Sequence, residues 1–223
     1  MTMCGIAGYI NLNKNSADLN ILKKMTNSIA HRGPDGEGHW VDRNIAIGHR
    51  RLAIIDLSKN ANQPMNLNNN LVLSYNGEIY NFKEIRNELI NLGHQFISKS
   101  DSEVVLHSWD EWGEECVSKF NGMFAFALWD KKKNALFLVR DRYGIKPLYY
   151  AIFGDIVIFG SEQKAILSHP KVVKTLDLKA FVEYFTFQNI FTDRTLFKNI
   201  KLLKNGSILE IKNDKNTPIE IKT

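Results

Sequence analysis

The sequence feature that most constrains the fold is a pair of apolar segments joined by a short charged turn. Met123–Trp129 is continuously apolar, Asp130–Asn134 is charged, and Ala135–Val139 is apolar again. Two apolar runs of strand length on either side of a short polar turn predict an antiparallel β-hairpin. The middle of the chain is therefore expected to contribute two neighbouring strands to a sheet.

Other strand and helix patterns surround this hairpin. Asn76-Gly77-Glu78 is typical of a turn, and the asparagine-rich segment 60–70 is expected to form a mobile loop. Because locally connected antiparallel strands are interrupted by helices, we expect an α+β fold with two mainly antiparallel sheets and helices outside them. Strands are predicted at 4–12, 45–49, 52–55, 71–75, 148–153, 156–159 and 207–211, and helices at 19–29, 83–92, 163–168, 178–187 and after Ser100–Glu103.

Composition sets the class of protein. The chain has 223 residues, of which 44% are hydrophobic, so it can bury a substantial core. Residues 164–223 hold 11 Lys and Arg against 6 Asp and Glu, whereas residues 1–163 are balanced at 18 each. These lysines are scattered, which disfavours nucleic-acid binding and indicates a solvated or partner-facing surface.

The two cysteines, Cys4 and Cys116, are too few for a disulfide scaffold or a zinc cluster, and we expect no metal site. Cys116 is expected to pack in the core. No apolar run approaches the roughly 20 residues of a membrane span, and no signal peptide opens the chain. The sequence therefore predicts a cytoplasmic protein without a membrane partner.

A cysteine stands unusually close to the start of the chain, in Cys4-Gly5-Ile6-Ala7-Gly8. Removal of the three residues before Cys4 would place a thiol and a free α-amine on one residue. An α-amine has a pKa of roughly 7.7 to 8.0 and a thiol about 8.5, so near neutral pH the amine can take the proton of the thiol. Position alone leaves a second interpretation open, in which Cys4 is a small buried residue of a first strand.

Short motifs follow Cys4 in a fixed order, and together they carry a resemblance that covers residues 4–170. The chain resembles the glutaminase domain of glutamine-hydrolysing asparagine synthetases, which are class II amidotransferases with an N-terminal nucleophile. The resemblance implies an N-terminal-nucleophile fold, a four-layer α-β-β-α sandwich, with glutamine as the substrate. The motifs are Cys4–Gly8, His31–Asp35, Gly48–Asp56, Asn76–Asn81, Ser100–Glu103, Gly122–Asp130, Arg140–Tyr150 and Ser161–Ala165.

The resemblance implies three catalytic residues. Cys4 would be the nucleophile, with its own α-amine as the base after processing, and would form a γ-glutamyl thioester. Asn76 and Gly77 would form the oxyanion hole, through a side-chain amide and a backbone N–H. Without the neighbouring motifs, Asn76-Gly77 would be read as an ordinary hairpin turn.

The resemblance also implies a clamp for the amino-acid end of glutamine. Arg51 matches the arginine that pairs with the α-carboxylate, because a planar guanidinium can make two parallel contacts. Arg50 beside it is expected to be a solvated charge. Glu78 and Asp101 match acceptors for the α-ammonium group, and Asp101 could also be a helix N-cap.

A rival mechanism would pair Cys4 with His31 or His49 as in Cys-His hydrolases. The family motif assigns neither histidine as a base, so we disfavour this alternative.

The domain prediction follows from the same motifs. Residues 1–3 are expected to be a leader that is removed, residues 4–175 an amidotransferase domain, and residues 176–223 a bridge towards a synthetase domain. Neither a Ser-Gly-Gly-x-Asp-Ser pyrophosphate loop nor a Gly-x-x-x-x-Gly-Lys-Ser/Thr phosphate loop occurs in the sequence. We therefore expect no cofactor in this chain, with ATP and Mg²⁺ used only by the absent synthetase domain.

Several alternatives stay open on the sequence alone. The chain could serve a separate ATP-dependent synthetase subunit, or it could be the remnant of a truncated synthetase, and it could form oligomers. A catalytically silent, glutamine-binding scaffold is the alternative outside the enzyme class. The acceptor of the ammonia, aspartate or another carboxylate, is not specified by these motifs.

Overall fold

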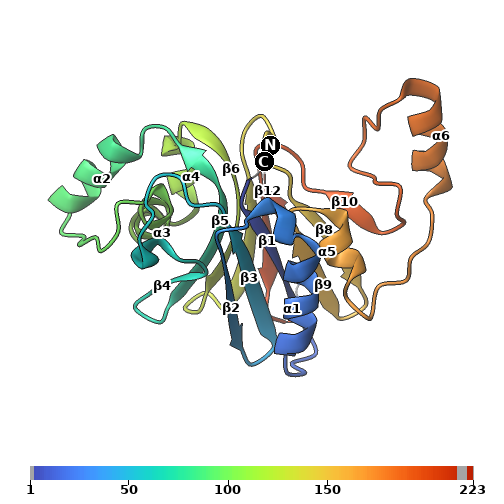
Figure 1. Ribbon diagram of the computed structural model, residues 1–223, viewed down its shortest axis with the longest axis horizontal. Coiled ribbons are helices and arrows are strands. Elements are labelled where there is room, and N and C mark those ends of the chain that lie inside the picture. The colour runs from blue at the N-terminus through green and yellow to red at the C-terminus, as the bar shows by residue number, and fades with distance from the viewer. Residues whose placement is uncertain (1–2, 215–219, 223) are drawn as a thin grey trace.

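The computed structural model describes residues 3–214 and 220–222. Within them, two six-stranded sheets form the centre of the molecule (Figure 1). All pairings between neighbouring strands in both sheets are antiparallel. The first sheet has the order β10 (Ile200–Leu202), β8 (Tyr149–Phe153), β9 (Ile156–Gly160), β1 (Gly5–Asn11), β3 (Ile45–Arg51) and β2 (Gly36–Asp42).

The second sheet contains the hairpin that the sequence predicts most clearly. Gly122–Asp130 and Ala135–Arg140 form β6 and β7, which pair from Ala125 opposite Arg140 to Asp130 opposite Ala135. The order is β12 (Glu220–Lys222), β11 (Ser207–Lys212), β7, β6, β5 (Leu71–Ile79) and β4 (Met65–Leu67).

Helices cover the outer face of each sheet. Leu22 and Met25 of α1 (Leu19–Ser28) pack with Ile166 of α5 (Gln163–Leu167) against the first sheet. The second sheet is covered by α2 (Phe82–Asn91), α3 (Asp101–Trp112) and α4 (Cys116–Lys119). Short 3₁₀ turns lie at η1 (Ala30–Arg32), η2 (Lys59–Ala61) and η3 (Gly113–Glu115).

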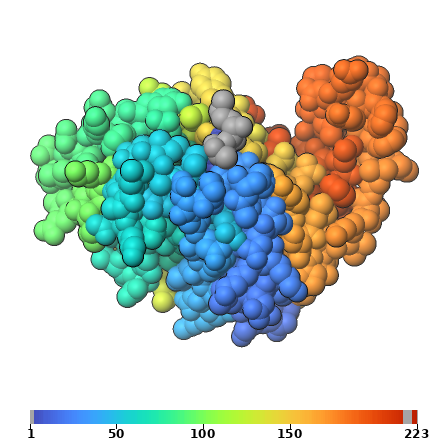
Figure 2. All heavy atoms as spheres, viewed as in Figure 1, coloured from blue at the N-terminus to red at the C-terminus, as the bar shows by residue number. Residues whose placement is uncertain are grey.

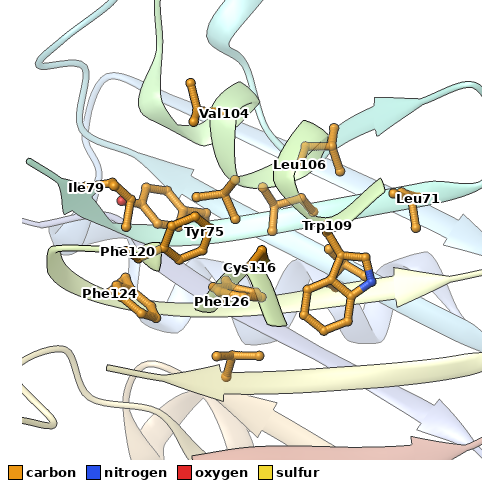
Figure 3. Packing of buried hydrophobic residues seen from close by; sticks show 14 of the residues in the cluster. Leu71, Tyr75, Ile79, Val104, Leu106, Trp109, Cys116, Phe120, Phe124 and Phe126 are labelled. Carbon is orange, nitrogen blue, oxygen red and sulfur yellow. The ribbon is translucent and has the colours of Figure 1, made fainter. Parts of the chain in front are cut away.

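Three apolar layers hold this arrangement together. Ile6 and Ile10 of the first sheet share a buried cluster with Ala125 and Leu138 of the second, so the sheets face each other directly. Figure 3 shows the layer between α3 and the second sheet, where Trp109 lies near Phe126. The layers run helix, sheet, sheet, helix, which confirms the predicted four-layer sandwich. Each Å² of apolar surface removed from water stabilises the fold by about 25 cal/mol, so the apolar side chains buried in these layers contribute the main stabilising free energy.

Three local predictions are wrong. Asn76-Gly77-Glu78 does not turn, because β5 continues to Ile79 and pairs with β6 along its whole length. Segment 52–55 is not a strand, since β3 ends at Arg51 and the chain then enters a loop. Segment 60–70 is not a loop throughout, because it contains the end of η2 and the short strand β4.

The tail after residue 175 contributes to both sheets. β10 pairs with β8 in the first sheet, and β11 pairs with β7 in the second. In contrast, α6 (Leu178–Phe187) stands apart from both sheets in Figure 1, and this part of the chain forms a projecting orange lobe in Figure 2. Ala180 is its buried residue. That this tail bridges to a further domain remains a prediction.

Candidate active site

Cys4 lies immediately before β1, where the start of β1 meets the end of β3. Gly5 pairs with Arg50 across these antiparallel strands, which brings Cys4 beside Leu52. The Leu52 N–H donates to the Cys4 Sγ at 3.3 Å. The Arg32 Nε donates to the Cys4 carbonyl oxygen at 2.9 Å. The nucleophile candidate is thus held through its backbone and its sulfur by two different segments.

Burial governs the acidity of this thiol. Removal from water raises the pKa of Cys4, while the Leu52 N–H lowers it by favouring the thiolate. The negative charge of Asp101 raises the pKa further, whereas Arg51 and Arg32 lower it. The thiol therefore needs a base close to it to react near neutral pH.

Asn76 and Gly77 lie inside strand β5, opposite Ala125 and Phe124 of β6. The Asn76 side chain is buried, with 1% of its surface exposed, and its Nδ2 has no hydrogen-bond partner among the described residues. A buried amide donor without an acceptor costs about 1–3 kcal/mol, so such a group is expected to await a ligand.

Gly77 is required by the neighbouring strand. A Cβ atom at this position would lie 2.5 Å from the carbonyl oxygen of Met123 and 2.7 Å from the Cα of Phe124. The close approach is therefore between β5 and β6, and Gly77 lines the cleft together with Asn76.

Arg51 is the last residue of β3 and reaches into the loop that follows it. Its guanidinium donates to Asn62 Oδ1 at 2.7 Å, to Ser58 O at 3.1 Å and to Asp56 O. These acceptors are neutral, so they orient the Arg51 guanidinium without neutralising its charge.

Arg50 points elsewhere. Its side chain pairs with Glu37 at 2.6 Å and donates to the carbonyl oxygen of Thr26 at 3.2 Å. The expectation that Arg50 is a solvated charge is wrong, because its side chain is only 13% exposed and is paired with a carboxylate.

Asp101 begins α3 and is not its N-cap, which is Ser100. The Asp101 Oδ2 accepts from the Tyr75 hydroxyl at 2.8 Å and from the Ile79 N–H at 3.1 Å. Burial raises the pKa of Asp101, and the hydrogen bonds from Tyr75 and Ile79 oppose that rise. Glu78, on β5, lies on the same cleft.

One cleft brings all of these groups together. It is lined by the six residues that the sequence singles out, Cys4, Arg51, Asn76, Gly77, Glu78 and Asp101, and by others that include Met3, Leu52, Tyr75, Met123 and Lys146. It therefore combines a thiol, an unpartnered amide donor, the cations of Arg51 and Lys146, and the carboxylates of Asp56, Glu78 and Asp101. This set is able to bind an amino acid and attack its side chain.

The two histidines of the rival mechanism are not among the residues that line this cleft. His49 is fully buried, and its Nδ1 lies 3.1 Å from the Ser74 hydroxyl. Burial lowers the pKa of His49 to about 3. His31 pairs with Glu162 at 2.9 Å. The geometry therefore gives no support to a Cys-His pair.

Sequence reasoning missed four residues of the site: Arg32, Leu52, Tyr75 and Lys146. Arg32, Leu52 and Lys146 stand within the motifs that carry the resemblance, so their positions were visible but their contacts were not. Tyr75 ends the predicted strand 71–75, and nothing in that pattern indicated that its hydroxyl would reach Asp101.

Among the described residues, no group of three or more His, Cys, Asp or Glu side chains is arranged to hold a metal ion. No helix in the described part of the chain is long and apolar enough to span a membrane. Cys116 packs in the core between α3 and the second sheet, as expected.

The sequence and the fold of this chain are similar to those of known proteins. A family model described as "Glutamine amidotransferase domain" matches residues 3–221. The chain belongs to this glutamine amidotransferase family. Two relatives in Bacillus subtilis (strain 168) are named asparagine synthetase [glutamine-hydrolyzing] 3 and 2. The first is 41% identical over 217 residues, covering 95% of this chain and 35% of the relative. The second is 41% identical over 218 residues, covering 94% and 29%.

The amidotransferase domain thus spans about a third of the length of these relatives. Among solved structures, glutamine phosphoribosylpyrophosphate (PRPP) amidotransferase from B. subtilis, complexed with ADP and GMP, superimposes with a TM-score of 0.71 at 20% identity. The match covers 98% of this chain and 49% of the other. This likeness concerns the fold alone, and it agrees with the predicted four-layer α-β-β-α sandwich.

Proposed function

We propose that this amidotransferase domain hydrolyses glutamine to glutamate and ammonia through a γ-glutamyl thioester on Cys4. The observation that carries the proposal is the buried Nδ2 of Asn76, which has no partner among the described residues and lines the same cleft as the Cys4 thiol. A donor that lacks an acceptor beside a nucleophile is suited to an oxyanion that exists only during reaction.

The chemistry divides into two steps. The Cys4 sulfur attacks the side-chain carbonyl carbon of glutamine, and the Cys4 α-amine takes the thiol proton. Asn76 Nδ2 and the Gly77 N–H hold the oxyanion while the amine passes its proton to the leaving nitrogen, which departs as ammonia. Water, activated by the same amine, then hydrolyses the thioester and releases glutamate.

Charge complementarity supports the assignment of the amino-acid clamp. Arg51 is oriented by neutral acceptors only, so its charge is available for the α-carboxylate. Glu78 and Asp101 supply two carboxylates on the same cleft for the α-ammonium group. This arrangement would select a free amino acid over a protein side chain.

The mechanism requires that Cys4 be the first residue, because an amide nitrogen bound to Met3 has no basicity. We therefore propose that residues 1–3 are absent from the active form. Mass spectrometry of the natively expressed protein should find Cys4 first. An active protein that retains Met3 would exclude the α-amine as the base.

The decisive assay compares the chain that begins at Cys4 with its Cys4→Ala variant. We expect glutamate and ammonia from the first and neither from the second. Equal ammonia release from both would reject the enzymatic proposal. Glutamine binding without turnover in both would favour the alternative of a silent glutamine-binding scaffold.

We further propose that the ammonia serves an ATP-dependent synthetase that amidates aspartate or another carboxylate. Two observations support this: the relatives named asparagine synthetase are about three times longer than the matched region, and α6 exposes an apolar surface. Leu178 and Phe185 of α6 are 69% and 68% exposed. An exposed apolar helix of this kind is typical of a protein interface. ATP and Mg²⁺ would act in the synthetase, and this chain would use no cofactor.

The partner proposal can be tested with the unmatched two-thirds of the B. subtilis relative as the synthetase. Mixing it with this chain should give glutamine-dependent and ATP-dependent asparagine. The Phe185→Asp variant should lose that synthesis and keep its glutaminase activity, whereas Lys179→Ala should keep both. Self-association that Phe185→Asp abolishes would instead identify α6 as an oligomer interface. We expect the system to work in the cytoplasm, where a reducing environment keeps thiols free.

A further inference from the structure

Lys146 is a buried cation in the cleft for which the proposed mechanism has no role. It lines the cleft together with Cys4 and Glu78, and only 6% of its surface is exposed. No carboxylate of the described residues lies within ion-pair distance of its ammonium group. A buried lysine without a paired carboxylate is costly, so its position calls for a functional explanation.

The backbone around Lys146 is fixed by two buried charged residues. The Lys146 N–H donates to Asp141 Oδ2 at 3.0 Å, and its carbonyl oxygen accepts from Arg140 Nε at 2.9 Å. Asp141 also accepts from the N–H groups of Phe124, Tyr143 and Ile145. This turn after β7 therefore delivers the Lys146 side chain to one defined place in the cleft.

That place is beside the side chain of Met3, the residue that precedes Cys4, in the cleft that Cys4 also lines. The Lys146 Nζ lies 2.9 Å from Met3 Sδ, which is only a weak acceptor. In the active form without residues 1–3, that contact is gone and the new α-amine of Cys4 begins where Met3 ended. The ammonium of Lys146 would then lie close to the amine that has to act as the base.

From this geometry we propose that Lys146 is a positioning residue whose positive charge keeps the α-amine of Cys4 free of its proton. The inference rests on the proposed function, because it concerns the form that begins at Cys4. Without Lys146, the resting site would hold a protonated amine, which cannot accept the thiol proton. The positive charge of Lys146 disfavours the form of Cys4 in which both the amine and the thiol carry their protons. The first proton is therefore lost at a lower pH, whether it leaves from the amine or from the thiol.

Other charged groups surround Lys146 and Cys4. Around Lys146 lie Arg32, Glu78 and Asp141, and around Cys4 lie Asp101, Arg51 and Arg32. Burial lowers the pKa of Lys146, and Arg32 lowers it further, whereas Cys4, Glu78 and Asp141 raise it. Because both the amine and the thiol lose their protons more easily beside a cation, removal of Lys146 should move both limbs of the pH profile to higher pH.

The test measures the pH dependence of two reactions in the chain that begins at Cys4. One is kcat/KM for glutamine, and the other is the rate at which iodoacetamide alkylates Cys4, read by site-resolved mass spectrometry. For Lys146→Met, with Lys146→Gln as a second neutral variant, we expect both acid limbs to rise by about one pH unit. At pH values below the limb, kcat/KM and the alkylation rate should each fall about tenfold, and both should recover at high pH. Lys146→Arg should keep the wild-type limb position, and the exposed Lys132→Met is the matched control.

Several results would overturn the inference. An unshifted acid limb in both neutral variants would remove the electrostatic role. Loss of activity at every pH in Lys146→Arg would mean that Lys146 carries a proton itself. The alkylation profile separates these outcomes from a failure of the proposed function, because Cys4 titrates whether or not glutamine is turned over. A Cys4 that alkylates with the expected shift but releases no ammonia would uphold the role of Lys146 and reject the glutaminase.

Discussion

The Tyr75 hydroxyl donates a hydrogen bond of 2.8 Å to the Asp101 carboxylate, and this contact joins strand β5 to the start of α3. Both side chains are buried. Burial raises the pKa of Tyr75 well above its usual value, with Asp101 adding to that rise, so the phenol keeps its proton and remains a donor. The contact favours the ionised form of Asp101, which is the form that can accept an α-ammonium group.

Replacement of Tyr75 by phenylalanine should weaken glutamine binding. Loss of a hydrogen bond to a charged group costs about 1.5–3 kcal/mol, so KM for glutamine should rise about tenfold or more. Because the pKa of Asp101 would rise further, the acid limb of glutamine binding should also move to higher pH. The exposed Tyr143→Phe is the control. An unchanged KM in Tyr75→Phe would show that Asp101 does not hold the substrate.

Asn76→Ala should impair the reaction more than the fold. Removing one donor to an oxyanion costs roughly 100- to 1000-fold in kcat. The free energy of unfolding should not fall, because Nδ2 of Asn76 has no partner to lose among the described residues and its removal relieves the cost of burying an unpaired donor. Steady-state kinetics and urea unfolding measure the two quantities, with the exposed Asn91→Ala as the control. A KM increase with unchanged kcat would assign Asn76 to ground-state binding instead.

Gly77→Ala should lower both the free energy of unfolding and kcat. A Cβ placed 2.5 Å from the Met123 carbonyl oxygen must push β5 and β6 apart, which costs about 1–3 kcal/mol of stability. The same displacement should shift the Asn76 amide and lower kcat. Gly36→Ala is a suitable control, because its Cβ would meet nothing closer than 3.8 Å. Equal stability of the two variants would contradict the close approach of the strands.

Glu103 should make stability depend on pH. Burial raises its pKa, but the nearby His107 and the hydrogen bonds from Ile97 and Ser98 outweigh that effect and lower it from 4.5 to about 2. A lowered pKa in the folded state means that the stabilisation is complete above about pH 4.5 and is lost as the pH falls towards 2. Glu103→Gln should cost about 2 kcal/mol at pH 7 in urea unfolding and much less at pH 3.

The exposed Glu115→Gln serves as the control for this titration. A difference between wild type and Glu103→Gln that stays constant from pH 7 to pH 3 would contradict the lowered pKa of Glu103. Because Glu103 anchors residues just before α3, its loss should also loosen Asp101 at the start of that helix.

The sequence predicts elements well where the pattern is local. The hairpin of β6 and β7 is recognisable because apolar runs and a charged turn are adjacent in the chain. The predicted strand at residues 71–75 is also confirmed, but β5 continues to Ile79 instead of ending at Tyr75. Asn76-Gly77 has turn chemistry, and only pairing with Ala125 and Phe124, nearly fifty residues away, keeps it extended.

The sequence by itself determined the family of this chain, the two-sheet sandwich and the residue types of its cleft, because ordered motifs and apolar periodicity are written locally. Only the tertiary structure decided which atoms meet: the Asn76 amide left without a partner, the Tyr75 hydroxyl on Asp101, and the Lys146 ammonium beside Met3. These contacts depend on strand register and on the packing of one sheet against the other. No local pattern encodes those distances, because they join residues that are far apart in the chain.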